Sequence, residues 1–154
     1  MAIEKLEERL PIEVYKLSNV MMREAQNVLS AQCAELDDAS GGFSCVNGWI
    51  LHYLYNHREE DIFQRNIEQE FCITRSTASK IIRLMEKKML LSAESVPEDA
   101  RLKKVVLGQR AKPYRSLMKI TMDSLEEQML QGFSPEELRQ MMNFLKRMQK
   151  NLKK

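Results

Sequence analysis

The sequence predicts a mainly α protein with a small β wing, arranged as a winged helix-turn-helix with flanking helices at both ends of the chain. Two helical patterns separated by a tight turn lie between residues 64 and 90, and two short β-prone runs follow directly. Long amphipathic patterns precede and follow this central part. With 154 residues, the chain has room for a single domain with its own core.

The first central helix is expected from Gln64 to Phe71, with Ile67 and Phe71 one turn apart on one face. Residues 72–74 form a turn of the length found in helix-turn-helix units. Either Thr74 or Ser76 can cap the second helix through its side-chain oxygen. The inward stripe of that helix and its continuation comprises Ala78, Ile81, Ile82, Met85 and Leu90.

The outward face of the second helix carries short hydroxyls and long cations. Its members are Arg75, Ser76, Thr77, Ser79, Lys80 and Arg83. Such a face suits the major groove of DNA, where cations meet phosphates or guanine edges and hydroxyls bond to either. An ordinary amphipathic surface helix is the alternative interpretation, because its exposed face is polar as well.

The two β-prone runs, 90–94 and 103–107, flank a turn segment at 95–102. Pro97 presets a turn backbone, and Asp99 can bond its own turn amides. The hairpin presents Arg101, Lys103 and Lys104 near its tip and on its returning strand. A guanidinium at a hairpin tip can enter a narrow minor groove. A solvated surface hairpin would explain the turn residues, but not the cations clustered beside a helix-turn-helix.

This segment resembles the MarR family of bacterial transcription regulators. The resemblance rests on an Asp-x-Arg motif at 99–101 and a Val-x-Leu strand at 105–107, preceded by the run at 84–88, and it extends over nearly the whole chain in length and helix order. It implies that Arg101 is the wing-tip arginine, that Asp99 steadies the wing, and that the exposed face of the recognition helix comprises Ser76, Thr77, Ser79, Lys80 and Arg83. The sequence departs from the family pattern at three positions, where Met89, Gly108 and Ala111 replace a glycine, a threonine and a glycine.

The formal net charge of +2 conceals a strong segregation along the chain. Residues 62–112 hold 11 Lys and Arg against 6 Asp and Glu, a net +5, whereas residues 1–61 hold a net −6 and residues 113–154 a net +3. A basic centre in an otherwise acidic body indicates a polyanion-binding face.

The flanking helices are interpreted as dimerisation helices, over 1–36 and 111–154, around a DNA-binding lobe at 45–107. The first helix is expected from about Pro11 to Leu36 with an apolar stripe of Val14, Leu17, Met21, Ala25 and Val28. Ser44 caps a helix through His57, and the loop before it spans 37–43. A helix at 111–130 has Leu117, Ile120, Leu125 and Met129 on one stripe. Ser134 caps the last helix and Pro135 begins it, and its seam comprises Leu138, Met141, Met142, Leu145, Met148 and Leu152.

A lone C-terminal helix would leave the apolar side chains of this seam exposed to water, so pairing of the seam across a two-fold axis is predicted. The alternative is that the seam folds back onto its own monomer. Two recognition helices in a homodimer then read a near-palindromic operator in double-stranded DNA. The hypothesis is a ligand-responsive repressor that a small molecule releases from DNA, and the family resemblance implies a phenolic or other aromatic ligand. The family resemblance implies a ligand cleft that Tyr15, Asn19, Trp49, His52 and Tyr53 would line. Packing explains Trp49 and Tyr53 as well, and His52 can be a partly buried, hydrogen-bonded histidine.

Several other classes are weighed against this hypothesis. A thiol-based redox regulator of the same fold would use Cys72, since Cys33 lies at the wrong end of the first helix, although a buried, inert thiol is the simpler interpretation of Cys72. A winged-helix protein-interaction module would not need the exposed cations. The sequence offers no phosphate loop, catalytic set or metal cluster, so no enzyme, cofactor or metal is expected. Without a spanning segment or signal peptide, no membrane partner is expected and the location should be cytoplasmic.

Overall fold

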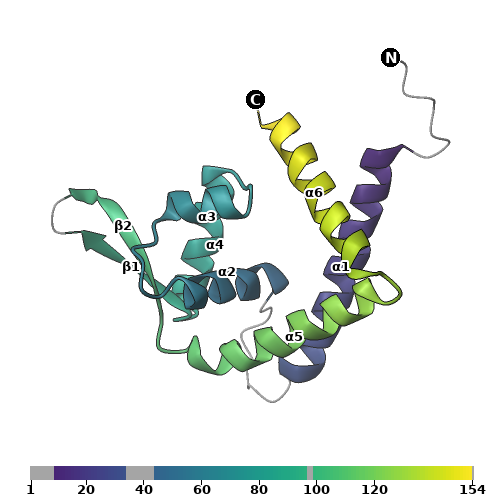
Figure 1. The fold of residues 1–154 in the computed structure, drawn as a ribbon. Coiled ribbons are helices and arrows are strands. Elements are labelled where there is room, and N and C mark those ends of the chain that lie inside the picture. The colour runs from purple at the N-terminus through teal and green to yellow at the C-terminus, as the bar shows by residue number, and fades with distance from the viewer. Residues whose placement is uncertain (1–8, 34–43, 97–98, 154) are drawn as a thin grey trace. The chain divides into compact units, whose positions relative to one another are not determined.

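The computed structural model describes residues 9–33, 44–96 and 99–153, except for the side chains of 32, 33 and 99–101. The elements follow in the order α1 (Leu10–Cys33), α2 (Cys45–Asn56), α3 (Gln64–Glu70), α4 (Arg75–Lys87), β1 (Leu91–Val96), β2 (Asp99–Leu107), α5 (Lys112–Leu130) and α6 (Pro135–Leu152). Figure 1 shows helices throughout, with β1 and β2 projecting as an antiparallel wing beyond α3 and α4. This confirms the predicted fold class. The chain forms two compact units, Met1–Met122 and Asp123–Lys154.

The helix starts follow the predicted caps. Ser44 accepts a hydrogen bond from the Asn47 backbone N–H (3.3 Å), and Thr74, not Ser76, accepts one from the Thr77 backbone N–H (3.2 Å). Ser134 and Glu137 form a reciprocal capping box before α6. The bonds from Ser134 also lower the pKa of the Glu137 carboxyl, because they favour its charged form.

The helix-turn-helix packs along one apolar stripe. Ile67 of α3 and Ala78, Ile82 and Met85 of α4 are buried, as is Leu90, which follows α4. Ile81, expected in the same stripe, is half-buried. The face of α4 opposite these side chains is therefore left to solvent.

The wing is longer than the sequence predicts. Its strands cover Leu91–Val96 and Asp99–Leu107, so residues 95, 96 and 99–102 of the expected turn segment 95–102 belong to the strands. The first expected strand ended too early, because Ser95 is polar yet pairs with Lys103 of the expected second strand. A register shift between Ser95 and Val96 follows. At its base, the Val105 N–H donates to the Ile62 carbonyl oxygen (2.7 Å), which fastens β2 to the connection between α2 and α3.

The flanking helices are only partly buried. In α1, Ala25 and Leu29 are buried, but Val14 and Leu17 are 45% and 56% exposed. The expected helix end at Leu36 and the expected loop at 37–43 lie outside the described residues. In α5, Leu117 and Leu125 are buried as predicted. Ile120 and Met129 are exposed, since the buried arc runs instead through Tyr114, Leu117, Met118, Thr121 and Leu125. None of the residues of α6 is buried.

The end of α4 has an unusual backbone. The Met89 N–H donates to the Glu86 carbonyl oxygen (2.9 Å), and the Leu90 N–H donates to that of Met85 (3.0 Å). These two bonds form a Schellman motif, which needs a left-handed residue after the helix. Met89 takes that position with a φ of 57°. Its side chain is 54% exposed, so packing does not explain the choice of methionine.

Met89→Gly should therefore raise the free energy of unfolding by about 0.5–1 kcal/mol, because glycine has no Cβ to clash in the left-handed region. Chemical denaturation of the full chain at fixed protein concentration measures the change. Met89→Ala is the matched control, since it removes the exposed side chain but keeps the Cβ. An equal gain from alanine would show that backbone strain is not the cause.

Candidate nucleic-acid interface

The outer face of α4 carries the side chains that the sequence assigned to it. Arg75, Ser76, Thr77, Lys80 and Arg83 are exposed, and Ser79 is half-buried. In the described part of the chain, no ion pair holds Arg75, Lys80 or Arg83. These cations are therefore available to an anionic partner.

The start of α4 carries a group of exposed hydroxyls. The Thr74 Oγ1 lies 3.0 Å from the Ser76 Oγ and 2.9 Å from the Thr77 Oγ1. Gln64 of α3 reaches across to donate to the Arg75 carbonyl oxygen (3.2 Å), and this bond ties the two helices at the same end. Hydroxyls beside cations can bond to either phosphates or base edges.

Further along α4, the outer face forms a shallow hollow of about 420 Å³. Its lining comprises Ser76, Ser79, Lys80, Arg83, Leu84 and Lys87. Sequence reasoning missed Lys87, although it continues the row of Ser76, Lys80 and Arg83 at helical spacing. It also missed Leu84, which is 48% exposed on this face.

A second cavity, of about 210 Å³, lies where α4 meets the wing. Lys103 of β2 lines it together with Gln64, Ser79, Ile82, Arg83, Glu86, Ala93 and Val105. The structure thus brings Lys103 to the recognition helix, where Arg83 and Ser79 lie. Arg83 of α4 and Lys103 of β2 therefore line the same cavity.

Lys104 is placed differently from Lys103. Its ammonium lies 2.5 Å from the Asp61 carboxylate, and the bond to Asp61 raises the pKa of Lys104. It lines another cavity, of about 200 Å³, with residues of α2 and of the α2–α3 connection. Neighbouring residues of a strand point to opposite faces, which explains the separation. The side chains of Asp99 and Arg101, the remaining wing candidates, lie outside the described part of the structure.

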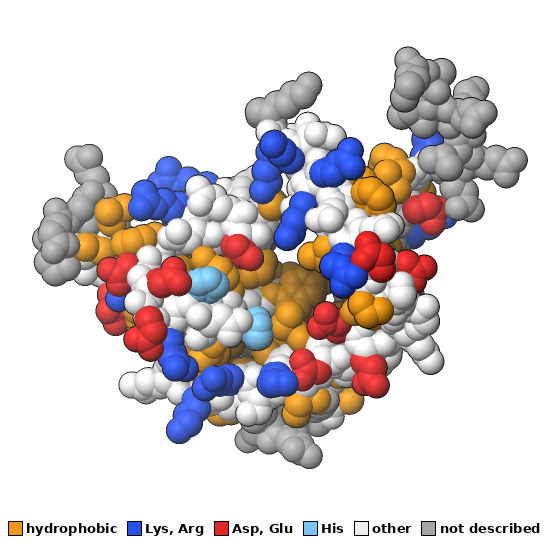
Figure 2. All heavy atoms as spheres, in the orientation of Figure 1, with side chains coloured by type: hydrophobic (Ala, Val, Ile, Leu, Met, Phe, Trp, Pro, Cys, Tyr) orange, Lys and Arg blue, Asp and Glu red, His pale blue; other side chains and the backbone are white. Residues whose placement is uncertain are grey.

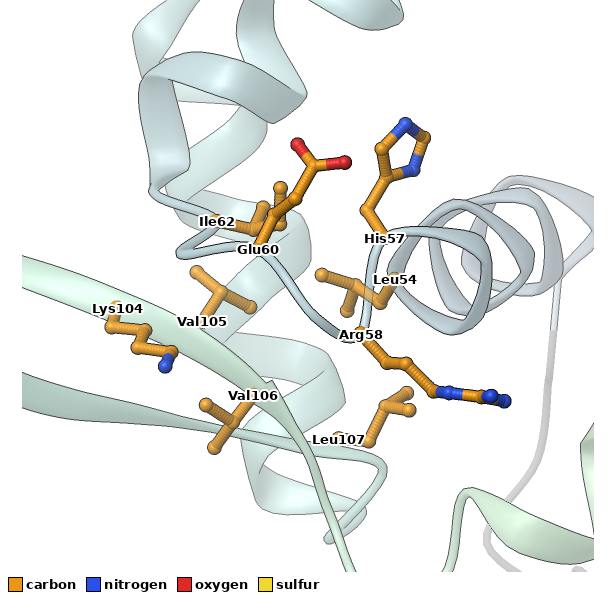
Figure 3. Close-up of a pocket in the computed structure, with 9 residues that line it drawn as sticks. All are labelled: Leu54, His57, Arg58, Glu60, Ile62, Lys104, Val105, Val106 and Leu107. Atoms are coloured by element: carbon orange, nitrogen blue, oxygen red, sulfur yellow. The ribbon is translucent and has the colours of Figure 1, made fainter.

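The face shown in Figure 2 is not a continuous basic surface. Over the part occupied by α2 and the wing, it carries both histidines and a group of acidic side chains. Glu59, Glu60 and Asp61 belong to the connection between α2 and α3 and are exposed. Figure 3 shows Glu60 on this connection, with its carboxylate pointing away from the apolar side chains of the cavity that Lys104 lines.

The candidate ligand residues differ in their burial. Tyr15 is 67% exposed on α1, and Asn19 is exposed on the same helix. Trp49 is half-buried. The Tyr53 ring lies 4.3 Å from the His57 ring and 5.9 Å from the Phe71 ring, and burial together with Glu70 and Glu60 raises the pKa of Tyr53.

His52 is half-buried, and its Nε2 lies 2.9 Å from the Asn56 Nδ2. The interpretation of His52 as a hydrogen-bonded helix residue therefore fits its position.

The two cysteines with described side chains differ. Cys45 is buried, its Sγ donates to the Gln26 Oε1 (3.5 Å), and burial raises its pKa, so its thiolate is scarce at neutral pH. Cys72 is exposed, with a φ of 51°, in the turn of the helix-turn-helix. The expectation that Cys72 is buried was wrong, because its turn position points the side chain to solvent.

Two searches of the described residues gave negative results. No group of three or more His, Cys, Asp or Glu side chains in the described ranges is arranged to hold a metal ion. Within the same ranges, no helix combines the length and apolar character that crossing a bilayer requires.

Comparison with known proteins places this geometry among regulators. No family model matches the sequence. The transcription regulator MarR from Oenococcus oeni PSU-1 is 27% identical with a TM-score of 0.67, and the match covers 92% of this chain and 96% of that one. The S. aureus MepR–DNA complex is 23% identical with a TM-score of 0.79, covering 96% and 100%. The heme sensor protein PefR from Streptococcus agalactiae, in complex with heme, is 23% identical with a TM-score of 0.58, covering 97% and 95%.

Proposed function

We propose that the chain, whose fold is that of the MarR-family winged-helix regulators, is a sequence-specific, dimeric DNA-binding transcription regulator and not an enzyme. One observation carries the proposal: Arg75, Lys80 and Arg83 lie exposed on the outer face of α4, and Lys103 of the wing lines a cavity together with Arg83. Cations on two elements can grip phosphates on both sides of a major groove that α4 enters. A DNA partner also supports a cytoplasmic location.

Recognition by α4 would combine phosphate contacts and base contacts. Arg75, Ser76 and Thr77 lie at the start of the helix, the end that helix-turn-helix proteins direct at base edges. Lys80, Arg83 and Lys87 follow on the same side and suit the phosphates. From the family resemblance, Arg101 would enter the minor groove and Asp99 would steady the wing.

Dimerisation is proposed from the apolar surface that the chain leaves in water. In α1, Leu10, Val14 and Leu17 are 45–56% exposed. In α6, Met142 and Leu145 are 50% and 39% exposed, and Leu152 is 86% exposed. Apolar side chains spaced along a helix favour a partner surface. A second copy would bury both helices and space the two α4 helices at roughly 34–36 Å, the repeat of a near-palindrome.

We further propose that a small molecule releases this repressor from DNA. Its binding would displace one DNA-binding lobe of the dimer, and that lobe would then lose its contacts with DNA. Each base contact is worth about 1–3 kcal/mol. Tyr15, Asn19, Trp49, His52 and Tyr53 remain candidate ligand residues. A thiol-based signal is the second candidate, since the exposed Cys72 lies in the turn that orients α4. A protein-interaction module is disfavoured by the free cations on α4.

Arg101→Ala should weaken binding to an operator selected from a random DNA pool by about 1–3 kcal/mol, because the change removes a groove contact. Fluorescence anisotropy measures the affinity. The melting temperature and the oligomeric state should stay unchanged. Arg23→Ala, an exposed arginine of α1, is the control. If the two variants bind alike, the wing tip has no part in recognition.

Lys103 and Lys104 should differ in the salt dependence of DNA binding. Removing one phosphate contact lowers the slope of log Kd against log salt by about one. Lys103→Ala should show this full loss, and Lys104→Ala a smaller one, because Asp61 already neutralises Lys104. Titrations at several salt concentrations test the pair. Equal losses would mean that Lys104 leaves Asp61 for a phosphate.

Leu145→Asp should convert the dimer into monomers, because it places a charge in the apolar seam of α6. Asn143→Asp is the matched control, since Asn143 is exposed on the opposite side of the same helix. Sedimentation at several protein concentrations gives the mass. A dimer that survives Leu145→Asp unchanged would contradict the proposed seam.

A further inference from the structure

Leu84 is an exposed aliphatic side chain on the face of α4 that the proposed function places against DNA. Its side chain is 48% exposed, and it lines the shallow hollow of that face. The other described residues that line the same hollow are polar or charged: Ser76, Ser79, Lys80, Arg83 and Lys87. A single exposed leucine needs no explanation on most surfaces. This one is of interest because it lies within a group of side chains suited to a polyanion.

The spacing of α4 fixes where Leu84 lies on the helix. Leu84 follows Thr77 by seven residues and Lys80 by four, and Lys87 comes three residues later. Residues at these spacings lie on one side of a helix. Thr77, Lys80 and Lys87 are exposed as well. The helix therefore presents Leu84 on the same side as its cations, away from the buried stripe.

The proposed dimer gives Leu84 no partner, because its apolar seam belongs to α1 and α6. The partner must then be found on DNA. In the major groove the base edges carry hydrogen-bond donors and acceptors, and their one apolar group is the C5-methyl group of thymine. Serine, lysine and arginine can bond to polar edge atoms or phosphates, whereas leucine makes only apolar contacts. The thymine methyl is thus the base-edge group that complements Leu84.

We propose that Leu84 is a specificity-determining residue that contacts the C5-methyl group of a thymine in each half of the operator. This assignment rests on the proposed DNA-binding function. The contact favours thymine, because it removes the apolar surface of the methyl group and of Leu84 from water. It disfavours cytosine, because Leu84 would cover the cytosine amino group without offering a hydrogen bond. Lys80 and Lys87, one turn to either side, would bind phosphates and position Leu84 over the base edge.

Deoxyuridine provides the test, because it lacks the methyl group of thymidine and keeps the same hydrogen-bonding groups. An operator selected from a random DNA pool should contain a thymine at a fixed position in each half-site. Each thymine is replaced in turn by deoxyuridine, and fluorescence anisotropy with the full chain gives the Kd. At one position the Kd should rise about fourfold per half-site, the factor that corresponds to burial of one methyl group. Replacement in both half-sites should raise it roughly sixteenfold, since distant contacts contribute independently.

Leu84→Ala separates the leucine from other causes of methyl sensitivity, such as a change in DNA stiffness. This variant should bind the thymine and deoxyuridine operators with nearly equal Kd. Leu84→Met keeps an apolar side chain of similar size and should retain most of the preference. Met89→Ala is the matched control, because Met89 is 54% exposed two residues after α4 but does not line the hollow. Its preference for thymine should equal that of the unchanged chain.

An equal loss with deoxyuridine in Leu84→Ala and in the unchanged chain would assign the methyl contact to another residue and overturn the proposal. A selected operator without a fixed thymine, or one in which every thymine tolerates deoxyuridine, would overturn it as well. In these cases the chain still binds a preferred duplex, so the proposed function stands. If the chain prefers no duplex over a scrambled one, the proposed function fails and the role of Leu84 fails with it.

Discussion

The relation between α4 and the wing depends on a close approach of two backbone segments. A Cβ on Gly108 would lie 2.3 Å from the Met89 carbonyl oxygen, so only glycine fits there. Two backbone hydrogen bonds hold this approach: the Gly108 N–H donates to the Leu90 carbonyl oxygen (2.9 Å), and the Arg110 N–H donates to the Met89 carbonyl oxygen (3.1 Å). The end of α4, the start of β1 and the end of β2 are joined at this point. The cations on α4 and β2 therefore keep a fixed spacing, which a rigid DNA surface requires.

The alternation of side chains along β2 gives two neighbouring lysines different surroundings. Lys103 lines a cavity together with Arg83 of α4, and Lys104 pairs with Asp61. Adjacent lysines in the sequence thus have different electrostatic surroundings.

Much of the fold could be predicted from the sequence because its signals are local. Ser44, Thr74 and Ser134 mark helix starts through single hydrogen bonds to nearby backbone groups. The outward face of α4 follows from helical spacing alone. The wing length was underestimated, because backbone pairing gives polar residues such as Ser95 no pattern to reveal it. The ion pair of Lys104 with Asp61 joins residues 43 positions apart, and no local pattern records such a contact.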